Sequence, residues 1–152
     1  MGCGLGEILP QLYPQVVVPE EVVEELQRLC TPVAALDWAR NPPGRLIIQS
    51  AMALDNEADL ATLGRGERAA ITLALEHKPD VLLIIDESKG RLAAKRRQIR
   101  ILGTLGLLDI AAARGLVDLP PAIKNLEQTN FYVAPHLLAR LLDRDLERKR
   151  RL

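Results

Sequence analysis

The amino-acid sequence predicts an α/β fold in which a short, mostly parallel sheet lies between layers of helices. Short apolar runs alternate along the chain with longer amphipathic stretches, which is typical of parallel strands joined by crossover helices. One of these runs, VLLII at 81–85, is apolar at every position, as expected for a strand that is buried on both faces. A length of 152 residues favours one domain with a substantial core over two domains.

The first half of the chain contains two predicted helices and two predicted strands. In order, they are a helix at 5–13, a strand at 16–18, a helix at 19–30 and a strand at 45–49. Pro14 closes the first helix, and Pro19 stands in the first turn of the second, where a missing N–H does no harm. The proline-rich residues 31–44 are expected as loop or broken helix, and the polar residues 53–66 as turns.

The second half repeats the alternation and ends in helices. The predicted elements are a helix at 66–77, the strand at 81–85, a helix at 90–98, a strand at 99–102, a helix at 104–116 and two C-terminal helices. Leucine spacing in the last helix predicts an inward stripe of Leu137, Leu138, Leu141 and Leu142. Residues 1–143 are expected to form a single domain. Residues 144–152 are expected as a basic, loosely attached tail, with Arg144 to Arg151 in solvent.

Overall composition does not by itself indicate a nucleic-acid or membrane partner, which must be inferred from local features, and the cysteines indicate a compartment. The formal net charge is zero, so the chain lacks the basic excess typical of proteins that bind nucleic acid or membranes through overall charge. No apolar run reaches the roughly 20 residues of a membrane span. Cys3 and Cys30 have neither the spacing of a metal site nor a neighbouring His, which favours reduced thiols and a cytoplasmic protein.

Acidic residues follow the apolar strand at 81–85 directly. Asp86 and Glu87 stand where its carboxyl end is expected, and functional groups of parallel sheets collect at that edge. An alternative explanation is structural. Asp86 is also suited to cap a helix that begins near Ser88, because Asp is a favoured N-cap residue. The strand end alone leaves both explanations open.

Two more acids are directed inward by helical periodicity. At about 100° per residue, Glu25 lies at the edge of the apolar stripe of its helix, whereas Glu24 projects away from it. Glu67 is in line with the apolar face of the helix at 66–77. A carboxylate near a helix N-terminus is favourable in itself, but that effect does not require an inward direction. Acids gathered in this way repel one another, and a hard divalent cation with oxygen ligands relieves the repulsion.

Several segments together resemble the PIN-domain superfamily, and more narrowly a branch of small PIN-like proteins related to the toxin ribonucleases of Vap-type toxin–antitoxin pairs. The segments are VVVPEEVVEEL, LGRGERAAITLALE and DVLLIIDESKGRLAAKRRQIRILGTLGLLDIAAARGLV. The resemblance implies a PIN-like three-layer α/β domain that hydrolyses RNA with Mg²⁺ or Mn²⁺. It implies Glu25, Glu67 and Asp86 as catalytic residues and metal ligands, with Glu87 as a further ligand, and an antitoxin as a protein partner.

One departure from the family pattern concerns the N-terminus. A PIN domain normally begins with a buried central strand that ends in Asp or Asn, whereas this sequence begins inside what would be the following helix. The expected domain is therefore N-terminally truncated. Three explanations stay open: a start placed too far downstream, a form that no longer cuts, or a gap closed by rearrangement or by another protomer. Exposed strand edges are usually covered in proteins, which predicts a homo-oligomer, a dimer.

Basic residues follow the strand-end acids. Arg91, Lys95 and Arg96 are predicted to contact phosphates of bound RNA, because a phosphodiesterase must neutralise the backbone of its substrate. A solvated helix face is the alternative explanation for each of them. An aromatic content of 3% argues against recognition by base stacking, so contacts to phosphate and shape are expected.

A second function from another class is a catalytically inactive PIN-like module that binds a partner or nucleic acid. In that case the Leu-rich segment HLLARLLDRDL would offer a helix to a partner's groove. The nuclease hypothesis makes a geometric prediction instead. It places Glu25, Glu67 and Asp86 within one coordination sphere, and it expects a raised pKa for at least one of them.

Overall fold

The computed structural model describes residues 5–28, 44–52, 57–129 and 131–152. Helices and strands alternate through most of this part of the chain, as predicted. In order they are α1 (Leu5–Leu12), β1 (Val16–Pro19), α2 (Glu20–Arg28), β2 (Leu46–Gln49), α4 (Ala58–Ala61), α5 (Arg65–Glu76), β3 (Leu82–Ile84), α6 (Ser88–Arg96), β4 (Arg100–Leu102), α7 (Thr104–Ala113), α8 (Leu119–Glu127) and α9 (Pro135–Arg150). The α/β class is therefore confirmed.

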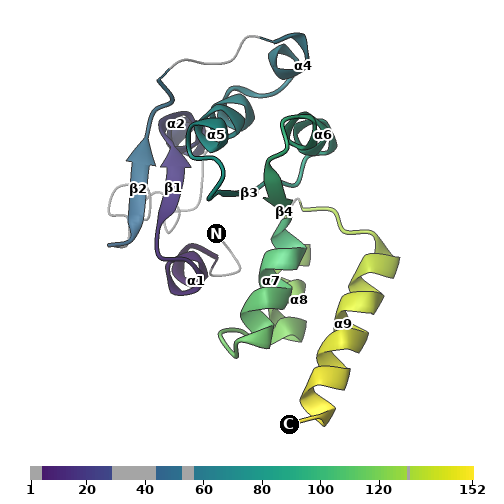
Figure 1. Ribbon diagram of the computed structural model, residues 1–152. Coiled ribbons are helices and arrows are strands. Elements are labelled where there is room, and N and C mark those ends of the chain that lie inside the picture. Colours follow the sequence, from purple (N-terminus) through teal and green to yellow (C-terminus); the bar gives the residue numbers. More distant parts are fainter. Residues whose placement is uncertain (1–4, 29–43, 53–56, 130) are drawn as a thin grey trace.

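The strands form two separate parallel pairs. β1 pairs with β2, with Val17 opposite Ile47, and β3 pairs with β4, with Leu83 opposite Ile101. Figure 1 shows the first pair beside α2 and the second beside α6 and α7. The parallel direction was predicted correctly. The prediction of one sheet was wrong for the described residues, because no described strand pairs with both β1 and β3.

Helix α5 connects the two strand pairs. It contacts β1 and β3 as well as α2 and α6, and its Ala69 and Ile71 are fully buried. The largest core cluster extends from this helix to Leu83 and Ile85 on the strand side and to Ala94 of α6. The first turn of α5, which carries Glu67, therefore lies between α2, which carries Glu25, and the start of α6, which Glu87 precedes.

A second core joins α7, α8 and α9. Leu141 is buried there, and Leu138 and Leu142 pack against the same cluster at half-buried positions, as predicted. Leu137 was also expected to face inward, but 45% of it is exposed. At 3.6 residues per turn, Leu138, Leu141 and Leu142 share one face of the helix. Leu137 lies outside the centre of that face and is therefore more exposed.

The residues expected as a loose basic tail continue helix α9 to Arg150. Asp145 is only 3% exposed, and it forms ion pairs with Arg148 and Lys149 on its own helix. Arg148 also bonds to Asp109 of α7 at 2.6 Å. Arg144, expected in solvent, is largely exposed but reaches the same Asp109 carboxylate at 2.8 Å. These ion pairs hold the end of α9 against α7.

Helix α4 lies within a segment that was expected as turns. Arg97, a mostly buried residue after α6, donates to both oxygens of Asp59 in α4 at 2.8 and 2.9 Å. This guanidinium keeps the pKa of Asp59 below its usual value. This ion pair joins α4 to the residue that follows α6. The predicted loop at 31–44 lies almost wholly outside the described residues. No described helix is long and apolar enough to cross a membrane.

Candidate functional site

Asp86 follows β3 and binds the start of helix α7. Its Oδ1 accepts from the backbone N–H of Thr104 at 2.8 Å, and its Oδ2 accepts from the Thr104 hydroxyl at 2.5 Å. Residues at a helix N-terminus have unpaired N–H groups, and a carboxylate there also interacts favourably with the helix dipole. Asp86 therefore has the capping role that the structural explanation gave it, although it caps α7 and not the helix beginning at Ser88.

Glu87 is the residue that caps α6. Its Oε2 accepts from the backbone N–H of Gly90 at 2.9 Å. The backbone N–H groups of Gly90 and Lys89 hold the pKa of Glu87 below its ordinary value. The two adjacent acids at the end of β3 thus bind the N-termini of two different helices.

Glu25 joins α2 to the first turn of α5. Its Oε1 accepts from the backbone N–H of Gly66 at 2.8 Å, in a half-buried position. Glu24 pairs with Arg65, the first residue of the same helix, at 2.9 Å. Both glutamates are half-buried, so Glu24 does not project wholly into solvent as expected. The helical rotation places Glu25 against α5, where an exposed backbone donor is available.

Glu67 is half-buried between Glu25 and Glu87. Among the described residues its carboxylate has no hydrogen-bond donor and no cation. Its Oε2 lies 3.6 Å from the point where a Cβ on Gly90 would stand. Burial raises the pKa of Glu67, and the charges of Glu87 and Glu25 raise it further. The prediction that at least one of these acids has a raised pKa is confirmed, and the close approach of like charges is part of the cause.

The carboxylates of Glu67, Glu25 and Glu87 are suitable ligands for a hard cation, but their present positions do not surround one. Glu67 has both carboxylate oxygens free of described partners, and Glu25 and Glu87 each use one oxygen in a backbone hydrogen bond. Carboxylate oxygens are the ligands that Mg²⁺ and Mn²⁺ prefer. Within the described part of the chain, however, no three Asp, Glu, His or Cys side chains form a group that could hold a metal ion. Side-chain movement would be needed to bring three of these carboxylates around one ion.

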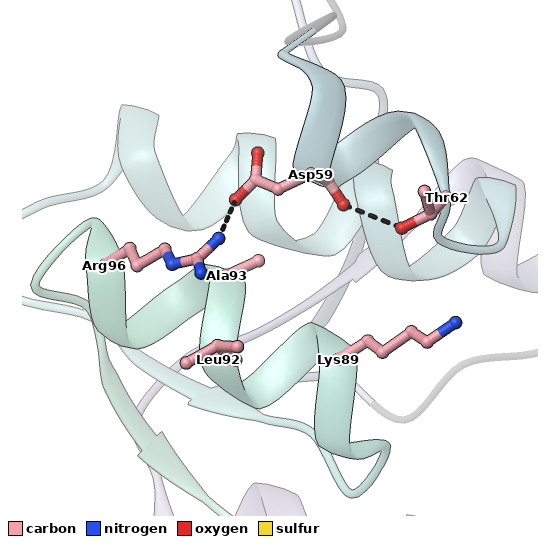
Figure 2. Close-up of a pocket in the computed structure, with 6 residues that line it drawn as sticks. All are labelled: Asp59, Thr62, Lys89, Leu92, Ala93 and Arg96. Atoms are coloured by element: carbon pink, nitrogen blue, oxygen red, sulfur yellow. Dashed lines mark hydrogen bonds and ion pairs between the residues drawn. The ribbon is translucent and has the colours of Figure 1, made fainter.

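The predicted phosphate-binding residues have different surroundings. Arg91 donates to the backbone carbonyl of Ile85 at 2.9 Å and is half-buried, so it helps to fix the end of β3. Lys95 is exposed. Arg96 is exposed and lies 3.8 Å from Asp59. Figure 2 shows Arg96 and Lys89 at the two ends of a hollow of about 150 Å³ between α4 and α6.

Two residues at the site were not identified from the sequence as partners of the acids. Thr104 binds both oxygens of Asp86, and Gly66 supplies the N–H that binds Glu25. The segments GTLG and GRGE, which carry these residues, belong to the motifs that resemble PIN domains. A Thr or Gly at a helix start is too common to indicate a specific carboxylate partner. Only the fold shows which acid each one meets.

Comparison with protein families agrees with this fold. A family model described as PIN domain matches residues 3–147, nearly the whole chain. The chain therefore belongs to the PIN-domain family. Comparison with curated proteins and with solved structures gives no match.

Proposed function

We propose that this chain is a PIN-type ribonuclease that hydrolyses RNA phosphodiesters and requires Mg²⁺ or Mn²⁺. Membership of the PIN-domain family supports a nuclease. The observation that carries the proposal is the Glu67 carboxylate, which is half-buried, has no described partner and is flanked by two further glutamates. Repulsion between these carboxylates destabilises the folded protein, and a bound cation would relieve it. Groups with such perturbed pKa values are frequent at functional sites.

In this proposal Glu67, Glu25 and Glu87 face the cation, and Asp86 completes the acidic edge from the start of α7. A divalent ion at such a site lowers the pKa of bound water and stabilises charge on the attacked phosphodiester. The protein's own residues orient the acids: Gly66 fixes Glu25, Gly90 fixes Glu87, and Thr104 fixes Asp86. In the same proposal, Lys95 and Arg96, which are exposed on α6, bind RNA phosphates outside the acidic site.

Metal binding is tested first by thermal unfolding with Mn²⁺. A ligand present at 100 times its Kd stabilises the folded state by about 2.7 kcal/mol, which corresponds to roughly 5–10 °C for a chain of this size. Glu67→Gln should lose most of this shift. Glu127→Gln, which changes an exposed acid on α8, should keep it. An equal shift in both variants would show that Mn²⁺ binds elsewhere.

Catalysis is tested separately with a mixed pool of RNA. Cleavage should require Mn²⁺ or Mg²⁺ and should fall at least about a hundredfold in Glu67→Gln, because that variant removes a charged ligand. Asp86→Asn should also reduce the rate, and Glu127→Gln should leave it unchanged. Cleavage that persists in Glu67→Gln and without divalent ions would contradict the proposal. A toxin role adds growth arrest on expression, relieved by Glu67→Gln and by a cognate antitoxin.

A catalytically inactive PIN-like module is the second candidate. It is favoured by the engagement of both Asp86 oxygens with Thr104 and by the absence of a three-ligand group among the described residues. The version of this module in which helix α9 fills a partner's groove loses support. The apolar stripe of α9 already packs against α7 and α8. Binding of RNA without cleavage, at any divalent ion concentration, would favour this second candidate.

A further inference from the structure

The hollow between α4 and α6 is lined on one side by a single face of α6 (Figure 2). Residues three, four and seven positions apart on a helix share a face, and the lining residues of α6 have this spacing: Lys89, Leu92, Ala93 and Arg96. Asp59 of α4 and Thr62, which follows α4, line the opposite side. The hollow therefore has a lysine at one end and an arginine at the other.

The two cations at its ends are not neutralised by the acid between them. Asp59 already accepts from Arg97 through both oxygens, at 2.8 and 2.9 Å. Arg96 comes only to 3.8 Å from Asp59, which is too long for a hydrogen bond. The Lys89 ammonium has no hydrogen bond or ion pair among the described residues. Even with Glu57, which shares Arg97 at 2.9 Å, the cations around the hollow exceed the acids.

The hollow borders the acidic residues of the candidate site. Lys89 directly precedes Gly90, whose N–H binds Glu87 and whose Cβ position would lie 3.6 Å from Oε2 of Glu67. At 1.5 Å per residue, Arg96 stands about 10 Å further along α6. An extended strand that passes the acids can therefore continue over the hollow.

The size and lining of the hollow limit what it can hold. Its volume of about 150 Å³ is half or less of the roughly 300–1,000 Å³ of pockets that enclose a whole small molecule. None of its lining residues is aromatic, so it offers no surface on which a base would stack. A small anionic group, such as the phosphate of a nucleic-acid backbone, matches both the space and the charge.

We propose that the hollow binds one phosphate group of an RNA strand that also passes the acidic residues, and that Lys89 and Arg96 hold this group from its two ends. The inference rests on the proposed function for its ligand. It deepens that function, because it requires a substrate that extends beyond the cleaved bond. A phosphate contact of this kind fixes the register of a strand and carries no sequence information.

The experiment measures binding of a fluorescent nine-nucleotide RNA to the full chain by fluorescence anisotropy in EDTA. The RNA has 2′-O-methyl riboses, which protect it from contaminating ribonucleases. Lys89→Gln and Arg96→Gln should each raise the Kd about threefold to tenfold, and each should lower the slope of log K against log salt by about 0.7, the value for one contact to a single strand. Lys124→Gln, which changes an exposed lysine of α8, should alter neither quantity.

Two further comparisons test whether the contact lies in the hollow. If both cations hold the same phosphate, the double variant should lose less affinity than the product of the two single losses, because residues that share a partner are not additive. Thr62→Glu places an acid in the lining and should weaken binding about tenfold. Ala61→Glu makes the same change of charge on the preceding exposed residue, outside the lining, and should have a much smaller effect.

Four results would overturn the proposal. One is absence of RNA binding by the unaltered chain, and another is an unchanged Kd and salt slope in Lys89→Gln. Fully additive losses in the double variant would mean two separate contacts, and equal effects of Thr62→Glu and Ala61→Glu would mean long-range electrostatics alone. Because the measurement needs no metal and no cleavage, the expected differences in a chain that never cleaves RNA would refute the proposed nuclease and leave this phosphate site standing.

Discussion

The hydrogen bond between Gly66 and Glu25 makes a prediction whose magnitude follows from the structure. A Cβ at Gly66 would lie 2.8 Å from Oε2 of Glu25 and 3.0 Å from Cγ2 of Val22. Gly66→Ala must therefore displace the Glu25 carboxylate and break its 2.8 Å bond to the Gly66 N–H. A hydrogen bond to a charged group contributes about 1.5–3 kcal/mol, whereas Gly to Ala within a helix gains about 1 kcal/mol. The expected net loss of stability, the difference between these two effects, is about 0.5–2 kcal/mol.

A double-mutant cycle tests the reasoning. In the Glu25→Ala background the bond and the closest contact are already gone, so Gly66→Ala should change the free energy of unfolding by only about 0.5 kcal/mol or less, since the Val22 contact offsets the helix preference. Free energies come from urea unfolding followed by circular dichroism. Gly64→Ala is the control for space, because nothing lies within 4 Å of its Cβ position. The same loss from Gly66→Ala in both backgrounds would refute the role assigned to Glu25.

Three other predictions concern the acids and the C-terminal helix. Because burial and the neighbouring glutamates raise the pKa of Glu67, the folded state keeps a proton that the unfolded state loses as pH rises through the ordinary carboxyl range, and stability falls across that window. Glu67→Gln should thus stabilise the metal-free protein at pH 7 but not at pH 3, and urea titrations at both pH values check this. Thr104→Val keeps the side-chain shape but removes the hydroxyl donor to Asp86; it should cost about 1–2 kcal/mol, and no loss of stability would contradict the capping role. Asp109→Asn weakens the ion pairs with Arg144 and Arg148; it should cost about 1 kcal/mol at low salt and less at 1 M salt, measured by thermal unfolding with Glu147→Gln as the exposed control.

Local patterns were sufficient for most elements. Period and turn chemistry placed α1, α5 and β3 to within about one residue, and α7 to within about three, because each is a contiguous apolar pattern bounded by Gly, Pro or polar residues. The same periodicity gave the inward direction of Glu25 and Glu67, since direction on a helix depends only on position in the repeat. Helix α4 was missed because its four residues are too few to show a helical period. Only the fold shows that Arg97, far along the chain, binds its Asp59.

The sequence by itself determined the α/β class and the parallel direction of the strands, and it indicated which acids are candidates for a site, because these depend on the period of apolar residues and on residue type. Only the tertiary structure decided what each acid does. Asp86 caps α7 and Glu87 caps α6, and Glu67 is the acid without a described partner. It also decided that the strands form two pairs with a cleft between them. The physical reason is that a hydrogen-bond partner or a strand neighbour is chosen by packing between distant segments, and that choice leaves no periodic trace in the local sequence.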